Sequence, residues 1–181
     1  MTTAFRAIID NGACGTGPSE AGTIYQGVIT TAGNTAVCYG NQIQVPITVQ
    51  SFVDVASINL TMDFDDSNLD FVGATHNGIP GVGWSFAVNE ISPGRIKASG
   101  FGPGYDLADN TVLMTLTFNY IGAATGGTFP LTWFEDPMDE SFCEYAADYP
   151  PNFPPFCDHP TATYYINGSL TVNPLPLVDD V

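Results

Sequence analysis

Basic residues are nearly absent from this chain. Only 3 of its 181 residues are Lys or Arg, against 19 Asp or Glu, which gives a formal net charge of −16 at pH 7. Proteins that bind nucleic acid or anionic membrane surfaces use Lys and Arg to neutralise phosphate groups. The composition therefore argues against both partners. It leaves divalent cations, salty surroundings, a basic partner or simple solubility as reasons for the acidity.

Long apolar runs and catalytic motifs are also missing. No apolar run is long enough to cross a bilayer, so we expect no membrane insertion. The histidines, His76 and His159, have no nucleophile motif beside them, and no GxSxG, HExxH or P-loop pattern occurs. We therefore expect that the chain is not an enzyme.

The clearest strand pattern runs from Ile58 to Val72 (INLTMDFDDSNLDFV). Apolar and polar residues alternate from Ile58 to Phe64, a period of two that puts one side of a strand in the core and leaves the other polar. Residues Asp65–Asn68 then predict a tight turn, because their short side chains bond their own backbone. An apolar strand resumes at Leu69, so the stretch predicts two strands of a sandwich joined by an acidic corner.

Similar alternation recurs along the chain, with turn signals roughly every 8–12 residues and no amphipathic helix. The sequence therefore predicts an all-β fold, a jelly-roll β-sandwich of about nine strands with an N-terminal arm and a disulfide-stapled insert. We place the arm at residues 1–22, the sandwich at residues 23–173 and a Pro-rich linker at residues 174–181.

Local signals add detail to this plan. The run Gly100–Asp106 (GFGPGYD) predicts a loop, and Leu107–Asn110 predicts a helical turn. Pro46, inside an alternating run, predicts an edge strand or a bulge. Residues Thr161–Val172 predict a closing pair of strand segments with a bend at Asn167.

Four cysteines are present, Cys14, Cys38, Cys143 and Cys157. An even number without CxxC spacing favours two disulfides and an oxidising compartment over a metal site. Three pairings are open. We favour the local ones, Cys14 with Cys38 and Cys143 with Cys157, each contributing roughly 2–4 kcal/mol. Four buried thiols are the alternative.

An insert between Glu135 and Pro160 is acidic and rich in proline and aromatic residues. Its aromatic side chains either cover an open end of the sandwich or form an exposed recognition patch that could stack on sugars; they are Tyr145, Tyr149, Phe153 and Phe156. The second alternative would make the chain a carbohydrate-binding module.

Acidic clusters give weak candidates for a calcium site. Calcium takes several oxygen ligands from one loop, and the candidates are Asp65 and Asp66 in the corner and Asp136 and Asp139 in the insert. Neither cluster has EF-hand spacing. We expect no cofactor, with calcium as the open alternative to an ordinary turn and a solvated loop.

Four segments resemble the cohesin domain, the module through which cellulosome scaffoldins capture dockerin-bearing proteins. Val45–Val49 (VPITV) is similar to the second-strand motif VPVxV, and Leu60–Val72 (LTMDFDDSNLDFV) is similar to the L-x-Y-D-P-x-x-L-x-F segment. Asn110–Phe118 (NTVLMTLTF) and Tyr165–Val172 (YINGSLTV) are similar to two later strands. Order and spacing agree from Thr23 to Asn173. The arm and the insert depart from the compact pattern and resemble cohesin-like modules of secreted bacterial surface proteins.

The resemblance implies a non-catalytic extracellular module that docks a dockerin-type partner, a calcium-loaded helix pair, on one sheet face. The residues at matching positions of that face are Asn59, Thr61, Asp63, Ser85, Asn89, Arg95 and Lys97. Arg95 and Lys97 are two of only three cations in the chain. The alternative is an ordinary solvated face, on which Arg95 or Lys97 pairs across strands with Asp63 or Glu90.

A structural role is a second alternative. The chain would then be a spacer or self-assembling subunit of a cell-surface fibre, with the N-terminal arm (residues 1–22) or the C-terminal tail joined to a neighbouring copy. All of these alternatives place the protein outside the cell or on its surface. No secretion leader is visible, so we expect it to be absent from this sequence.

Overall fold

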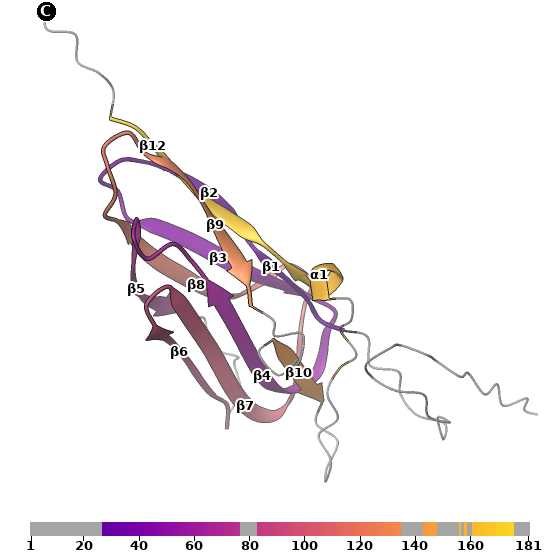
Figure 1. The fold of residues 1–181 in the computed structure, drawn as a ribbon. Helices are drawn as coiled ribbons and strands as arrows, with labels where there is room; N and C mark the ends of the chain where they lie inside the picture. The colour runs from indigo at the N-terminus through magenta and orange to yellow at the C-terminus, as the bar shows by residue number, and fades with distance from the viewer. Residues whose placement is uncertain are drawn as a thin grey trace, which may run out of the picture.

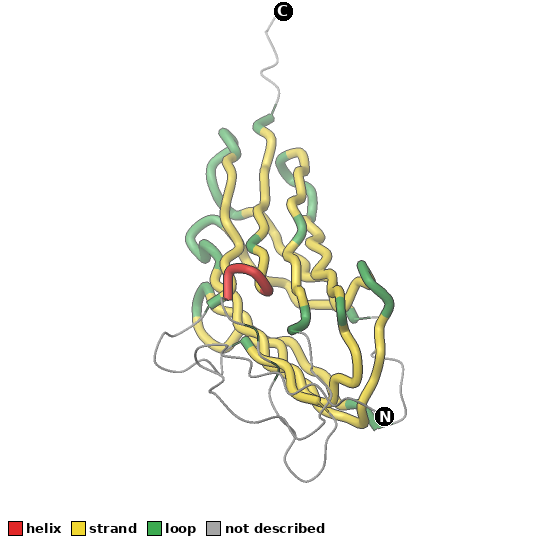
Figure 2. The backbone as a smooth tube through the Cα atoms, turned by 90° about the vertical axis from the view of Figure 1, so that its right-hand side faces the viewer, coloured by secondary structure: helices red, strands yellow, loops and turns green. Residues whose placement is uncertain are grey.

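The computed structural model describes residues 27–76, 83–134, 143–147, 156, 158 and 161–175. These residues form strands almost throughout, with one short helix (Figures 1 and 2). In chain order the elements are β1 (Ile29–Ala32), β2 (Asn34–Cys38), β3 (Ile43–Gln50), β4 (Phe52–Asp63), β5 (Leu69–Thr75), β6 (Ser85–Ser92), β7 (Arg95–Leu107), β8 (Thr111–Tyr120), β9 (Gly127–Trp133), β10 (Glu144–Ala147), α1 (Thr161–Tyr164), β11 (Tyr165–Ile166) and β12 (Gly168–Asn173).

The strands make two stacked sheets, which confirms the predicted all-β sandwich (Figure 1). The five-stranded sheet has the order β11-β1-β3-β8-β5. The seven-stranded sheet has the order β2-β12-β9-β4-β7-β6, with β10 also paired to β4. The described residues contain twelve strands, more than the predicted nine. The excess arises partly because the insert contributes β10 and the closing segment divides into β11 and β12.

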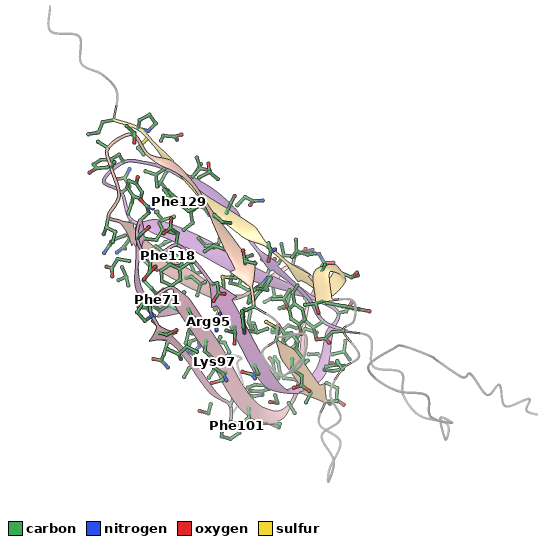
Figure 3. All side chains as sticks on the ribbon, in the orientation of Figure 1. Phe71, Arg95, Lys97, Phe101, Phe118 and Phe129 are labelled. Carbon is green, nitrogen blue, oxygen red and sulfur yellow. The ribbon has the colours of Figure 1, made fainter. Side chains whose placement is uncertain are left out.

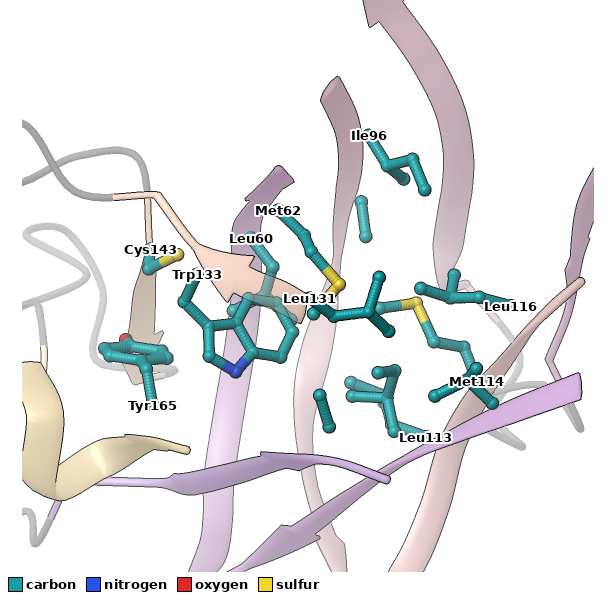
Figure 4. Close-up of a cluster of buried hydrophobic side chains, with 14 of the residues drawn as sticks. Leu60, Met62, Ile96, Leu113, Met114, Leu116, Leu131, Trp133, Cys143 and Tyr165 are labelled. Carbon is teal, nitrogen blue, oxygen red and sulfur yellow. The ribbon is translucent and has the colours of Figure 1, made fainter. Parts of the chain in front are cut away.

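The core lies between β3 and β8 of one sheet and β4, β7 and β9 of the other. Apolar side chains at alternate positions of β3 and β4 are buried, as the period of two predicts; they are Ile43, Val45, Ile47, Val49, Ile58, Leu60 and Met62. Figure 4 shows Leu60 and Met62 meeting Leu131 and Trp133 of β9 and Met114 of β8. Full burial of one such aliphatic side chain stabilises the fold by about 1.5–3 kcal/mol.

The acidic corner after β4 is the predicted turn. The Asp65 carboxylate accepts hydrogen bonds from the Ser67 backbone N at 3.0 Å and from Asn68 Nδ2 at 2.8 Å. Asn68 N and Leu69 N both donate to the Asp65 carbonyl oxygen, which closes the corner. These side-chain hydrogen bonds, first from Ser67 and then from Asn68, hold the pKa of Asp65 below its ordinary value.

The predicted loop at Gly100–Asp106 is wrong, because these residues belong to the long strand β7. The glycines serve close packing across the sheet. A Cβ atom at Gly100 would lie 2.6 Å from Phe86 Cδ2, and one at Gly102 would lie 2.5 Å from the Trp84 ring. Trp84 Nε1 also donates to the Pro103 carbonyl at 2.8 Å. Glycine therefore makes room here for aromatic rings of the neighbouring chain segment.

Other local expectations are also corrected. Leu107–Asn110 is the end of β7 followed by a turn, in which Thr111 N donates to the Ala108 carbonyl at 3.1 Å. Thr161–Tyr164 is helix α1 rather than strand. Pro46 lies in β3, which is central rather than an edge, with a bulge one residue later. Its missing N–H is tolerated because the paired residues of β1 end opposite Ile47.

Two of the four predicted disulfide cysteines lie among the described residues. Cys38 is exposed at the end of β2, opposite Asn173, and no disulfide joins it to Cys143. Cys143 Sγ lies 3.4 Å from the Phe134 carbonyl oxygen, at the opposite end of β9. The length of β9 separates the two by about 20 Å, which excludes that pairing. Cys14 and Cys157 lie outside the described residues, so the staple of the insert has no support here and stays a prediction.

The domain limits also stay predictions, because residues 1–26 and 176–181 lie outside the described part. Within the described residues, no helix has the length and apolar character needed to cross a membrane.

Candidate functional site

The candidate site is the side of the seven-stranded sheet that turns away from the core, over β6, β7, β4 and β10. We call it the outer face. Ile58, Leu60 and Met62 of β4 point into the core, so Ser57, Asn59 and Asp63 point outward. The same alternation turns these side chains of the other strands outward: Ser85, Ala87, Asn89, Arg95, Lys97, Ser99, Phe101, Glu144 and Ala146.

Strand pairing arranges these side chains in rows across the outer face. One row runs from Asn89 through Lys97 to Thr61, the next from Ala87 through Ser99 and Asn59 to Glu144, and a third from Ser85 through Phe101 and Ser57 to Ala146. The predicted site residues therefore come together on one face of one sheet. Whether they bind a partner stays a prediction.

Arg95 and Asp63 are paired with each other. Arg95 Nε donates to Asp63 Oδ1 at 2.6 Å, and Arg95 Nη2 donates to Asp63 Oδ2 at 2.9 Å. The Asp63 carboxylate raises the pKa of Arg95, chiefly through this hydrogen bonding. The guanidinium also lies over the Phe134 ring, 3.6 Å from its centroid. This cross-strand pair of Arg95 with Asp63 is the one expected if the outer face is an ordinary solvated surface. Because both side chains are partly exposed, it stabilises the fold by only about 0.2–1 kcal/mol.

Thr61 differs from the other predicted site residues because its side chain is fully buried. Phe134 N donates to the Thr61 carbonyl at 2.9 Å, and Cys143 Sγ lies 3.4 Å from both Thr61 N and Thr61 O. Thr61 Oγ1 has no hydrogen-bond partner within the described part of the chain. Thr61 is therefore on the outer side of β4 by alternation but is covered, and it presents no surface to a partner.

A depression of about 490 Å³ lies in the outer face. Its lining comes from β4, β6, β7 and β10 and consists mainly of small side chains: Ser57, Ile58, Asn59, Ser85, Ala87, Lys97, Ser99, Gly100, Phe101 and Glu144. Phe101 is the most exposed large apolar residue of the described chain, at 68%. Figure 3 shows Arg95, Lys97 and Phe101 following one another along β7.

Phe101 and Glu144 line the depression but are not among the residues that the sequence predicts for the site. Phe101 was assigned to a loop, although it continues the alternation of Arg95, Lys97 and Ser99 at intervals of two. Glu144 belongs to the insert. There Glu144 and Ala146 alternate with buried Tyr145 and Ala147, but this pattern can be recognised only when the bounds of β10 are known. Alternation through a glycine-rich run could have revealed Phe101, but nothing local identified Glu144.

The insert aromatics that the structure describes are buried. Tyr145 is fully buried and Phe156 is 3% exposed, so neither can stack on a sugar. Tyr145 Oη shares a hydrogen bond of 2.7 Å with Thr30 Oγ1, and its ring stacks on Tyr165 with centroids 6.4 Å apart. Burial raises the pKa of both tyrosines. Tyr149 and Phe153 lie outside the described residues.

The metal candidates gain no support from the described residues. The Asp65 carboxylate accepts hydrogen bonds from Ser67 and Asn68 within the turn. No group of three His, Cys, Asp or Glu side chains in the described ranges could hold a metal ion. Asp136 and Asp139 lie outside those ranges, so calcium binding stays untested.

Comparison with known proteins gives a consistent answer for the fold. No protein-family model and no curated protein matches the sequence. Solved structures do match. The seventh ScaB type I cohesin from Pseudobacteroides cellulosolvens superposes with a TM-score of 0.64 at 16% identity, covering 86% of this chain and 98% of the other.

Two further matches agree with it. The sixth cohesin of scaffoldin B from Acetivibrio cellulolyticus, solved with the Cel5 dockerin, gives a TM-score of 0.61 at 19% identity over 82% of this chain and 99% of the other. A type III cohesin of the ScaE scaffoldin from Ruminococcus flavefaciens gives 0.65 at 11% identity over 96% and 99%. The chain therefore has the fold of the cohesin modules.

Proposed function

We propose that this chain is a non-catalytic module that binds another protein on its outer face. The observation that carries the proposal is the depression between β6, β7, β4 and β10. Its lining consists mainly of the short side chains of Ser, Ala, Asn and Gly, which project little from the sheet, and Phe101 is exposed at one side. A surface of this shape lets a helix approach the strands closely, while an exposed aromatic ring offers area to bury.

The cohesin fold supports a dockerin-type partner, a calcium-loaded pair of helices. Several structures with this fold were solved as cohesin–dockerin complexes, among them the Acetivibrio cellulolyticus one. The predicted residues Asn59, Ser85, Asn89 and Lys97 surround or line the depression. Arg95 and Asp63, already paired, lie one row beyond Lys97 on the same face. As part of the same proposal, the module would work outside the cell or on its surface.

Filling the depression tests the proposal. Ser99 is exposed in the middle of the face, opposite Asn59 and Ala87, so Ser99→Trp should occupy the space that a partner needs. We expect wild-type chain to capture at least one of a panel of calcium-loaded dockerin modules, and Ser99→Trp to weaken that capture by tenfold or more, on the order expected for a blocked interface centre.

Thr125→Trp is the matched control, because Thr125 is exposed in a turn before β9 and away from the face. It should bind as the wild type does. Failure of the whole panel to bind at micromolar concentration, or equal capture by Ser99→Trp, would overturn the proposed function.

A further inference from the structure

Three side chains of different chemistry surround the depression: Lys97, Phe101 and Glu144. Lys97 and Phe101 are four residues apart on β7, which places them about 13 Å apart. Glu144 lies on β10, across β4 from both, and its row falls between theirs. Sheet spacings put it about 12 Å from each. The three therefore mark the corners of a nearly equilateral triangle around small side chains.

Each corner can make a different kind of contact. Arg95 is committed to Asp63, whereas Lys97 makes no ion pair among the described residues, so it is the cation that this face offers to a partner. Phe101 is the apolar corner, 68% exposed. Glu144 is the acidic corner and comes from the insert, whose strand β10 is fixed in the core by Tyr145 and Ala147.

We propose that this triangle selects the partner, which would bring an acidic group to Lys97, an apolar side chain to Phe101 and a basic group to Glu144. The inference rests on the proposed function and deepens it. The acidic and apolar groups would lie on one face of a helix running along β7. Helix positions seven or eight residues apart span about 11–12 Å, which matches the separation of Lys97 and Phe101. The basic group would come from a second element beside that helix.

Charge complementarity supports this arrangement over a uniformly basic partner. The chain as a whole carries −16, so long-range attraction favours cationic proteins of any kind. A positive corner about 12 Å from a negative one instead demands a partner with both charges in a fixed order. The order is set by β10, because that strand places Glu144 beside Asn59 of β4.

The test is a selection with charge reversal. A displayed library of calcium-loaded dockerin modules, randomised at exposed helix positions, is selected in parallel on full-length wild-type chain and on the Lys97→Glu, Glu144→Lys double variant. We expect the two selected pools to carry opposite charges at the two contact positions. Each pool should bind its own chain at least about tenfold more tightly than the other chain, as swapped charge pairs require. Pools with the same charges would overturn the inference.

Phe101 is tested separately on the binders selected with wild-type chain. Phe101→Ala should weaken them at least tenfold, as truncation of a central aromatic anchor does, whereas Phe101→Tyr should keep binding within about threefold. Ile121→Ala is the control, because Ile121 is 58% exposed but lies beyond β8 and outside the face. Equal binding by Phe101→Ala would remove the apolar corner from the inference.

The experiments distinguish a failure of the triangle from a failure of the proposed docking function. Suppose that Ser99→Trp blocks the binders, whereas neither the charge reversal nor Phe101→Ala affects them. That result would refute the selection by Lys97, Phe101 and Glu144 but would leave the docking face supported. Binders that Ser99→Trp leaves unaffected, or a library without binders, would overturn the proposed function itself.

Discussion

Replacing Tyr145 with Phe should destabilise the fold although it removes one oxygen atom only. Tyr145 and Thr30 are both 0% exposed, and their hydroxyl groups share a hydrogen bond of 2.7 Å that joins the insert to β1. Removing the phenol oxygen leaves the Thr30 hydroxyl buried without that partner. The cost of one such unsatisfied group is about 1–3 kcal/mol of unfolding free energy. Tyr145→Ala should cost more, about 3–5 kcal/mol, because it also removes ring contacts with Phe52 and Tyr165.

A double-mutant cycle measures the pair directly. Urea unfolding would be followed for wild type, Tyr145→Phe, Thr30→Val and the double variant, with midpoints and slopes compared. The double variant should be less destabilised than the sum of the single variants by about 1 kcal/mol or more, because neither hydroxyl is then left alone. A coupling energy near zero, with Tyr145→Phe as stable as wild type, would refute the claim that this hydrogen bond fixes the insert to the core.

Three further predictions follow from the packing, the acidic corner and the cysteines. Gly100→Ala should lower the unfolding free energy by about 1–3 kcal/mol, because its Cβ would lie 2.6 Å from Phe86 Cδ2 and 2.8 Å from the Ser85 carbonyl oxygen. The control Ser99→Ala, one residue away, should have an unfolding free energy within about 0.5 kcal/mol of wild type. Equal effects of the two substitutions would contradict the packing argument. The pKa of Asp65 is held below its ordinary value of 3.8, so its contribution to stability is present above pH 3.8 and is lost as the pH falls below it. Asp65→Asn should accordingly show a smaller loss of melting temperature than wild type between pH 4 and pH 2, roughly the window in which that carboxylate titrates, and identical acid profiles would count against the turn hydrogen bonds. Peptide mapping of the protein under non-reducing conditions should show no cross-link between Cys38 and Cys143, since the length of β9 lies between them; finding that cross-link would show the strand register to be wrong.

The sequence predicted the parts of the fold that obey a simple local rule. β4 is half-buried, so Ile58, Leu60 and Met62 alternate with polar residues, and the period of two is enough to assign the strand and its buried side. The corner at Asp65 is equally local, because its hydrogen-bond partners are only two and three residues away. Both features are determined within a short window of the chain.

The failures have long-range causes. Gly100 and Gly102 look like loop residues until Phe86 and Trp84 are seen to pack where their Cβ atoms would be. The path of β10 is decided by pairing with Ile58, far away in the sequence, and by the burial of Tyr145. Local propensity is overridden in both places by tertiary packing.

The candidate site shows the same division. Asn59, Lys97 and their neighbours could be assigned to one face, because outward positions follow from alternation and family resemblance. The burial of Thr61 could not be foreseen, because Cys143 and Phe134 come from other segments. The pairing of Arg95 with Asp63 was foreseen as an alternative, and the structure forms it.

The central claim is that a partner docks on the outer face, and NMR titration tests it most directly. The backbone amides of isotope-labelled chain would be followed while an unlabelled, calcium-loaded dockerin selected for binding is added. We expect the largest shift changes around the depression, at Asn59, Lys97, Ser99 and Phe101, and little change in β5 of the opposite sheet. Shift changes concentrated in β5 and β8, with Ser99 and Phe101 unmoved, would contradict it.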